Sequence, residues 1–481
     1  MDVLSSPTGA IAEAQRLASE AVGADRTWFL VNGSTVGLHA ALLAHASPGA
    51  TVAISRDCHQ SVHAALVLSG ARPLWVAPEH DTRFDVAWPS ARRFEAAIAP
   101  AEGRPNPHLA AALVTSPNYF GVCANVSRIA AACTRAGSAS PLPLIVDEAH
   151  GAHLPFLREG TDPPDALRAG AAVAVQSTHK TLGAMTQAAM VHARADRGAR
   201  CDAIDAALAV LQTSSPSYIL MASLDAARAH AATAARTFPP PPPPPHTRHV
   251  PSPSPPAGTF DAACALAAEL KARLGALDGL AVLGEGFAVP HSACNISACD
   301  GQGPLSFAMD PLRLTLGVSE IGMTGFEVAQ RLERDHGVVT ELATHKCVVF
   351  VITLGTTHPH VTRLVRALET ICVEAGRSRG MRERRAPDVP ACTWAGNGEA
   401  AMTPREAFFA RQGPVPFREA RGRVCARAVT PYPPGIPLLV PGELVTAEAL
   451  EAIDAIRRAG GKVIGAEDNA IVCVWERGRQ A

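Results

Sequence analysis

The chain has 481 residues, of which 47% are hydrophobic and 18% charged. With a typical domain near ~150 residues, this length predicts about two or three domains with sizeable cores. The 43 Lys and Arg residues against 44 Asp and Glu residues give a formal net charge of −1, which argues against a nucleic-acid binder held by bulk positive charge. No apolar run reaches the ~18–20 residues of a membrane span, so we expect no membrane-bound form.

The N-terminal residues and the cysteines narrow the class further. The first residues, MDVLSSPTGAIAEAQRL, have neither the basic and apolar regions of a signal peptide nor the Arg-rich, acid-poor composition of a transit peptide. We therefore expect a cytoplasmic protein, and an organellar location stays open. The twelve cysteines contain no C-x-x-C pair, so we expect no metal site.

Helical and extended segments alternate from residue 10 to about 230. Short apolar runs with few charges, typical of strands covered on both faces, occur at residues 28–31, 52–55, 74–77, 111–115, 142–146 and 172–176. Helical patterns lie around and between them at residues 11–22, 36–46, 61–69, 126–136 and 202–212. The alternation predicts an α/β fold with a mostly parallel sheet, whose ligands bind beyond the carboxyl ends of the strands.

The rest of the chain is divided by two segments of unusual composition. Residues 238–258 form a proline-rich, low-complexity insert with seven consecutive prolines, which predicts a polyproline-type spacer or loop. Residues 377–398 are predicted to be an exposed linker. The predicted domains are therefore a large domain (1–237), a small α/β domain (259–376) and a C-terminal domain (399–481).

Lys180 is the first candidate for chemistry, because only four of the 43 basic residues are lysines. The segment Ser177-Thr178-His179-Lys180 follows the strand predicted at 172–176. A lysine amine there could form a Schiff base with a carbonyl cofactor such as pyridoxal phosphate, whose phosphate Ser177 and His179 could bind. The tripeptide alone is a weak signal, because Thr344-His345-Lys346 repeats it in a predicted surface turn before a strand.

Asp147 is the second candidate, at the end of the strand predicted at 142–146. A carboxylate beside the nitrogen of a pyridine ring keeps that ring protonated and able to accept electrons. The segment DEAHGAH (147–153) could instead hold a metal ion or cap a helix, although it contains no H-E-x-x-H motif.

Two further segments also follow predicted strands. Ser34 and Thr35, in NGSTVG (32–37), would add hydroxyls to an anion site at a helix N-terminus, or the segment is an ordinary N-cap. His59, in RDCHQS (56–61), could stack on a flat ring or be a polar loop residue. Since all four segments follow strands, they should gather at one edge of the sheet.

Residues 175–189, VQSTHKTLGAMTQAA, resemble the cofactor-attachment signature of the Orn/Lys/Arg decarboxylase family. These are pyridoxal-phosphate-dependent basic amino acid decarboxylases with the aspartate-aminotransferase-like architecture, fold type I. Further similar stretches are FLVNGST (29–35), RDCHQSVHAALVLSGA (56–71), VDEAHGAH (146–153), QTSSPSYILMASLD (212–225) and PYPPGIPLLVPGE (431–443). The resemblance implies a large domain with a mostly parallel sheet, a smaller α+β domain and a C-terminal decarboxylase domain.

The resemblance also implies the roles of the site residues. Lys180 would form the Schiff base, Asp147 would pair with the pyridine nitrogen, His59 would stack on the ring and His150 would lie close to the cofactor. The phosphate would be bound by Ser34, Thr35, Ser177 and His179. The implied reaction is α-decarboxylation of arginine or lysine, and with less support ornithine, to an amine and carbon dioxide in polyamine-type metabolism.

The resemblance implies a homodimer or a higher homo-oligomer, in which residues 212–217 could reach the neighbour's cofactor. The cationic side chain of the substrate needs a carboxylate, and Glu320, Glu341 and Glu443 are candidates by residue type alone. Family members usually carry an N-terminal segment with a PGH-type motif that is missing before DVLSSPTGAI. This departure leaves open a catalytically impaired paralogue that pairs with a full-length enzyme. Another pyridoxal enzyme, such as an aminotransferase or lyase, also stays open, because it would share the fold and the lysine.

Overall fold

The computed structural model describes residues 2–100, 109–137, 140–157, 163–235, 260–284, 307–379, 400–432 and 435–475. The predicted proline-rich insert at 238–258 lies outside the described residues, as does most of the predicted linker at 377–398. The first three residues of that linker continue a helix, α11 (His358–Arg379). Within the described residues, no helix combines the length and the apolar character needed to cross a membrane.

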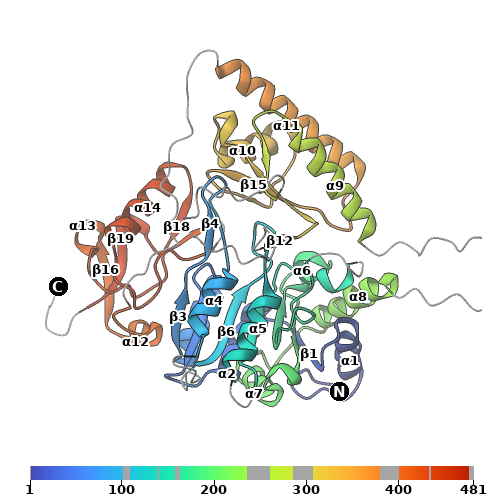
Figure 1. The fold of residues 1–481 in the computed structure, drawn as a ribbon, viewed down its shortest axis with the longest axis vertical. Helices are drawn as coiled ribbons and strands as arrows, with labels where there is room; N and C mark the ends of the chain where they lie inside the picture. The colour runs from blue at the N-terminus through green and yellow to red at the C-terminus, as the bar shows by residue number, and fades with distance from the viewer. Residues whose placement is uncertain are drawn as a thin grey trace, which may run out of the picture.

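A seven-stranded sheet with the order β1-β10-β9-β8-β6-β2-β3 forms the centre of the N-terminal region (Figure 1). Its strands are β1 (Arg26–Leu30), β2 (Thr51–Ser55), β3 (Arg72–Val76), β6 (Leu109–Thr115), β8 (Leu144–Asp147), β9 (Val173–Gln176) and β10 (Ala189–Ala193). Strands β3, β2, β6, β8 and β9 pair in parallel, whereas β10 is antiparallel to both of its neighbours. β1 therefore points the same way as the parallel strands, and the predicted mostly parallel sheet is confirmed.

Helices cover both faces of this sheet because side chains alternate along each strand. Phe29, Ala53 and Val114 face one core together with α1 (Ala10–Val22), α4 (Ala91–Ile98), α5 (Val126–Ala136) and α8 (Tyr218–Ala235). Their neighbours Leu30, Ile54 and Leu113 face a second core with α2 (Gly33–His45), α3 (Gln60–Ser69) and α7 (Cys201–Leu211). A strand buried on both sides needs the nearly uncharged sequences seen here.

A smaller α+β region follows, as predicted for the fold. Its antiparallel sheet has the order β11-β13-β15-β14, with β11 (Ala281–Val282), β13 (Arg313–Gly317), β14 (Leu342–Ala343) and β15 (Cys347–Val351). It packs with α9 (Asp261–Gly275), α10 (Gly325–His336) and α11. Strand β12 (Phe307–Met309) pairs with β7 (Val122–Ala124), which follows β6, and so joins this region to the large one.

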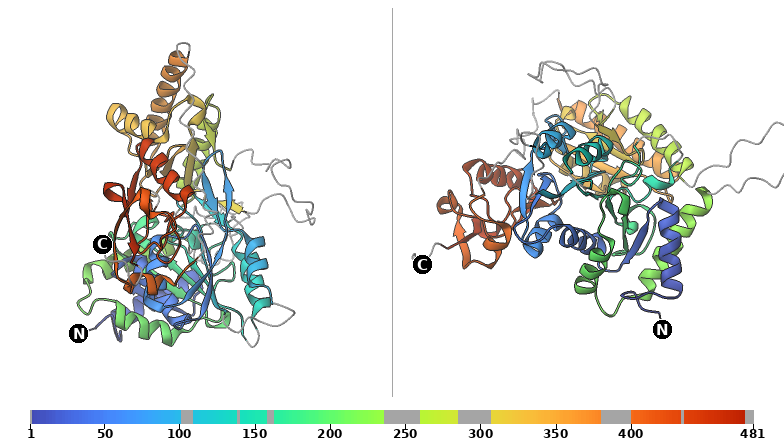
Figure 2. Two further views of the ribbon diagram at one scale, coloured as in Figure 1. Left: turned by 90° about the vertical axis from the view of Figure 1, so that its left-hand side faces the viewer. Right: turned by 60° about the horizontal axis from the view of Figure 1, so that its bottom comes forward.

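The C-terminal region has a core of its own. Its elements are α12 (Pro404–Phe409), β16 (Gln412–Pro416), α13 (Phe417–Ala420), β17 (Thr430–Tyr432), α14 (Ala447–Arg458), β18 (Lys462–Ile464) and β19 (Ala470–Val474). It lies against the β3 side of the large sheet (Figures 1 and 2). There α12 packs on α3. A buried ion pair of 3.0 Å between Arg56 and Glu443 fastens it there. The short hairpin β4 (Glu79–Asp81) and β5 (Val86–Trp88) follows β3.

Candidate active site

Lys180 lies in the short helix α6 (Thr178–Thr181), which begins directly beyond the carboxyl end of β9. Its Nζ lies 3.1 Å from Nε2 of His150 and 5.5 Å from the centroid of the Tyr119 ring. Burial lowers the pKa of the Lys180 ammonium, and the negative charge of Asp147 opposes that shift. The amine is thus held in a partly desolvated position where its neutral, nucleophilic form is favoured.

Asp147 is the last residue of β8, the neighbour of β9, and its side chain is only 2% exposed. One carboxylate oxygen accepts a hydrogen bond from the backbone N–H of Ala149 at 3.2 Å. Burial raises the pKa of Asp147 to about 6, an effect that the charge of Lys180 reduces. A positively charged N–H donor beside this buried carboxylate would therefore stabilise its ionised form.

His59 precedes α3, beyond the carboxyl end of β2, and caps that helix. Its Nδ1 accepts a hydrogen bond from the backbone N–H of Ser61 at 3.2 Å, and burial lowers the pKa of the imidazole to about 4. Gly435 of the C-terminal region lies beside the ring, and a Cβ there would meet His59 Cδ2 at 3.5 Å. The C-terminal region therefore helps to hold a neutral imidazole at the sheet edge.

The predicted phosphate turn brings two hydroxyls together at the start of α2. The Oγ of Ser177 donates to the Oγ of Ser34 at 2.8 Å, although these residues are 143 positions apart in the chain. The Asn32 side chain does not cap α2, because its oxygen accepts from the backbone N–H of Thr213 at 3.3 Å. The N-terminus of a thirteen-residue helix is thus left without a side-chain cap next to two hydroxyls, which suits an anion.

The other two predicted phosphate ligands are placed differently. Thr35 is exposed on the first turn of α2. The imidazole Nδ1 of His179 lies 2.8 Å from the carbonyl oxygen of Ala188, within the loop that follows α6. No hydrogen bond found in the described residues joins Thr35 or His179 to the hydroxyl pair of Ser34 and Ser177.

The polar residues of 147–153 point in different directions. His150 contacts Lys180, whereas Glu148 accepts hydrogen bonds of 2.7 Å from Ala166 N and from Gln176 Nε2. His153 Nε2 lies 2.9 Å from a carboxylate oxygen of Asp310. Over the described ranges, no three His, Cys, Asp or Glu side chains are grouped so that they could hold a metal ion.

Tyr119 belongs to the same site, and the sequence analysis did not identify it. Its ring centroid lies 4.3 Å from that of His150 and 6.4 Å from that of His59. Tyr119 follows β6, which lies between β2 and β8 in the sheet. The rule that found His59 and Asp147, a polar residue after a buried strand, would have found Tyr119 had it been applied to β6.

Arg313 is the second residue that the sequence analysis missed. It lies on β13 of the smaller sheet, is 1% exposed and places Nη2 2.9 Å from Nδ1 of His150. Its Nη1 donates to the carbonyl oxygen of Tyr119 at 3.3 Å. A cation inside the apolar segment LRLTL (312–316) is an unusual strand residue, and that was the available signal.

The three glutamates proposed for substrate recognition have different positions. Glu341 places Oε1 3.9 Å from Nη1 of Arg313 and its charge acts on Lys180. The carboxylate of Glu443 is buried against Arg56, so it is already paired with a cation and is not free for a substrate. Glu320 is exposed in a short 3₁₀ helix. Of the three, only Glu341 has a charge that is found to act on Lys180.

The second Thr-His-Lys segment forms the turn between β14 and β15, as predicted, but it is not wholly a surface turn. His345 is 8% exposed, with Nδ1 3.9 Å from a carboxylate oxygen of Asp85. The loop of the β4–β5 hairpin covers it, a long-range packing contact that the local sequence does not show.

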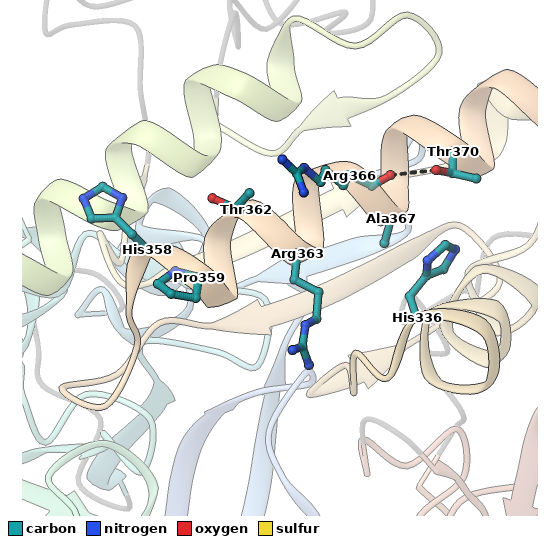
Figure 3. A pocket seen from close by; sticks show the side chains of 8 residues that line it. All are labelled: His336, His358, Pro359, Thr362, Arg363, Arg366, Ala367 and Thr370. Atoms are coloured by element: carbon teal, nitrogen blue, oxygen red, sulfur yellow. Dashed lines mark hydrogen bonds between the residues drawn. The ribbon is translucent and has the colours of Figure 1, made fainter.

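A separate cavity of about 590 Å³ lies along α11 (Figure 3). Its lining residues come from α11 and the end of α10: His336, His358, Pro359, Thr362, Arg363, Arg366, Ala367 and Thr370. None of them is a residue predicted from the sequence to take part in the chemistry.

Comparisons with known proteins agree with this architecture. The family model described as "Orn/Lys/Arg decarboxylase, major domain" matches residues 1–237, and that of the corresponding C-terminal domain matches residues 391–463. An arginine decarboxylase of Bacillus subtilis is 31% identical over 478 residues, which cover 98% of this chain and 86% of the relative. The crystal structure of the lysine decarboxylase LdcF of Francisella novicida superposes with a TM-score of 0.73 at 19% identity, covering 98% of this chain and 73% of that one. An SPT structure with PLP superposes with a TM-score of 0.53 at 14% identity, covering 77% of this chain and 78% of that one.

Proposed function

The chain belongs to the Orn/Lys/Arg decarboxylase family of amino acid decarboxylases, and from this membership we propose that it catalyses the pyridoxal-phosphate-dependent α-decarboxylation of a basic amino acid. The products would be carbon dioxide and an amine that enters polyamine-type metabolism. One observation carries the proposal: Lys180 and Asp147 extend from the ends of adjacent parallel strands, with the Lys180 amine held by His150.

The residues present fit pyridoxal phosphate. The partly desolvated amine of Lys180 suits its aldehyde carbon, the buried carboxylate of Asp147 suits its ring nitrogen, and the hydroxyls of Ser34 and Ser177 at the start of α2 suit its phosphate. When bound, the cofactor supplies an electron sink for the electron pair left on Cα as the carboxylate departs.

The protein's own side chains would prepare this chemistry. Asp147 would keep the ring nitrogen protonated, because the resulting N–H with its positive charge would stabilise the buried carboxylate. His59 would lie against the ring as a neutral imidazole, kept in place by its bond to Ser61 and by Gly435. Tyr119, between the two histidines, would help to exclude water, and water exclusion strengthens the charge interactions in the site.

The substrate side chain would be cationic, with arginine or lysine favoured over ornithine. We assign Glu341 as the carboxylate that attracts it, because its side chain is 44% exposed and its charge acts on Lys180. The names of the relatives, arginine decarboxylase in B. subtilis and lysine decarboxylase in F. novicida, support both amino acids and do not choose between them.

The assembly would be a homodimer or a higher homo-oligomer. The exposed side chains of Tyr218 (50%) and Ile219 (68%) adjoin residues 212–217, which the family resemblance places near a neighbour's cofactor. In this chain Gln212 accepts a hydrogen bond from the backbone N–H of Val31 at 3.0 Å and so supports the end of β1. Sedimentation of the full chain tests this part, and a monomer at working concentration contradicts it.

The decisive experiment supplies the purified chain with pyridoxal phosphate and, in turn, arginine, lysine and ornithine. We expect carbon dioxide and the matching amine from at least one amino acid, and neither product from the Lys180→Ala variant. A keto acid product would instead indicate an aminotransferase. Cofactor binding at Lys180 without any product would indicate the impaired paralogue.

A further inference from the structure

Three side chains from different parts of the chain form a continuous hydrogen-bonded row. Arg313 Nη2 lies 2.9 Å from Nδ1 of His150, and Nε2 of the same imidazole lies 3.1 Å from Nζ of Lys180. Arg313 is 1% exposed and His150 is 2% exposed, so water does not compete for the contact between them, and Lys180 is half-buried. The row joins the smaller sheet, through β13, to the carboxyl edge of the large sheet.

The chemistry of arginine determines where the protons lie. A guanidinium has only donors and does not lose its proton in proteins, so His150 Nδ1 must be the acceptor. A neutral imidazole with a bare Nδ1 carries its hydrogen on Nε2, and this Nε2–H points at Lys180. Lys180 can accept it only through a free electron pair, which the amine has and the ammonium lacks.

We propose that Arg313 is a positioning residue: it fixes His150 as the Nε2–H tautomer, and His150 in turn holds Lys180 as the neutral amine. The proposal rests on the proposed function only in taking Lys180 as the reactive amine. A neutral amine is the form that attacks a carbonyl carbon, so the row keeps the site ready for an aldehyde.

The charges around Lys180 act in both directions. Asp147 from β8 and Glu341, next to β14, favour the ammonium, whereas Arg313 from β13 and burial favour the amine. His59, His150 and His179 all have lowered pKa values because of burial, so they face Lys180 as neutral rings, and Tyr119 contributes its ring face. The two anions thus stabilise the Lys180 ammonium, and the buried Arg313 cation destabilises it. A hydrogen bond from His150 Nε2–H to the amine then favours the neutral form of Lys180.

The four lysines allow a direct test on the full chain without any cofactor. Trace acetylation across a pH series, read by mass spectrometry of peptides, gives the pH of half-maximal reactivity for Lys180, with the exposed Lys462 as internal reference. In Arg313→Gln we expect Lys180 labelling at pH 8 to fall about tenfold, which corresponds to a rise of about one pKa unit. Labelling of Lys462 should be unchanged.

A double-mutant cycle with His150→Gln separates positioning from simple charge. If Arg313 acts through the imidazole, Arg313→Gln shifts Lys180 much less in the His150→Gln background. An equal shift in both backgrounds overturns the proposal, as does an unchanged Lys180 in Arg313→Gln alone.

A measurement on the wild-type chain covers the case in which Arg313→Gln does not fold. Long-range ¹⁵N–¹H spectra of the ¹⁵N-histidine-labelled chain, assigned with His150→Gln, show which ring nitrogen carries the hydrogen. A protonated Nε2 supports the proposal, and a protonated Nδ1 overturns it. Neither readout involves decarboxylation, so absence of carbon dioxide would count against the proposed function alone.

Discussion

The two Thr-His-Lys segments, residues 178–180 and 344–346, have the same sequence but lie in different kinds of sheet. The first lies beyond a strand of a parallel sheet, where Lys180 meets His150 and the Tyr119 ring. The second is the turn of an antiparallel hairpin, where Lys346 Nζ donates to the carbonyl oxygen of Thr82 at 2.7 Å. Parallel strands bring several carboxyl ends to one edge, and a hairpin turn does not. Position in the sheet is therefore the reason for proposing Lys180, and not Lys346, as the reactive lysine.

The largest difference should appear when each lysine is removed. Lys180→Ala should reduce decarboxylation by roughly 10⁴-fold or more, as loss of a covalent catalytic group does. Lys346→Ala should stay within about twofold, as is usual for a side chain outside the site. Steady-state rates of amine formation measure both, and comparable losses in the two variants would contradict the distinction.

The acidic residue near each segment provides the second comparison. Asp147→Asn should lower activity by about 10²–10³-fold, the usual effect of losing one preorganised electrostatic group. The same variant should be more stable by up to about 3 kcal/mol at neutral pH without cofactor, because the pKa of the buried Asp147 is about 6 instead of 3.8.

This stability gain has a defined pH window. Between pH 4 and 6 the folded chain holds a proton on Asp147 that the unfolded chain has lost, so the penalty is complete above pH 6 and disappears towards pH 4. Urea unfolding of wild type and Asp147→Asn between pH 4 and 7 measures this penalty.

Asp85→Asn is the matched control. It should leave activity within about twofold and lower stability by about 1 kcal/mol, since Asp85 pairs with His80 at 2.8 Å. A gain independent of pH would contradict this account of Asp147.

His59→Phe tests a residue at the edge of the parallel sheet, and the hairpin turn at 344–346 has no residue in a comparable position. The pKa of His59 is about 4 in the folded chain against the usual 6.5 of an exposed imidazole, so the unfolded chain takes up the proton first as the pH falls. Wild type should lose up to about 3 kcal/mol through this residue between pH 6.5 and 4, and His59→Phe should not. The variant also loses the cap of α3, a constant cost of about 1 kcal/mol. If the unfolding free energies of wild type and His59→Phe changed equally between pH 6.5 and 4, this account of His59 would be contradicted.

The two threonines give the smallest expected effects. Thr344 Oγ1 accepts from the backbone N–H groups of Lys346 and Cys347 at 3.2 and 3.1 Å, so Thr344→Val should cost about 1–2 kcal/mol. Thr178 Oγ1 is buried and has no hydrogen-bond partner among the described residues, so Thr178→Val should be neutral or slightly stabilising. Thermal melts without cofactor measure both, and a larger loss from Thr178→Val would reverse the expected order.

Much of the fold and part of the site could be predicted from the sequence. Apolar runs marked six of the seven strands of the large sheet, all but the antiparallel β10, and the polar residues after β1, β2, β8 and β9 marked its carboxyl edge. Chain direction makes this reliable, because parallel strands end on the same side whatever their order. The roles given to the site residues and the domain boundaries stay predictions.

Other features depended on packing between regions that are far apart in the chain. Arg313 meets His150 across 163 residues, and Arg56 meets Glu443 across 387, which removed one candidate for the substrate carboxylate. Local patterns carry no information on such contacts, because they depend on how the separately formed sheets dock. The sequence by itself determined most strands of the large sheet, their common edge and several of the residues at that edge. Only the tertiary structure decided which further side chains reach that edge, because their strands and loops are brought there by long-range packing.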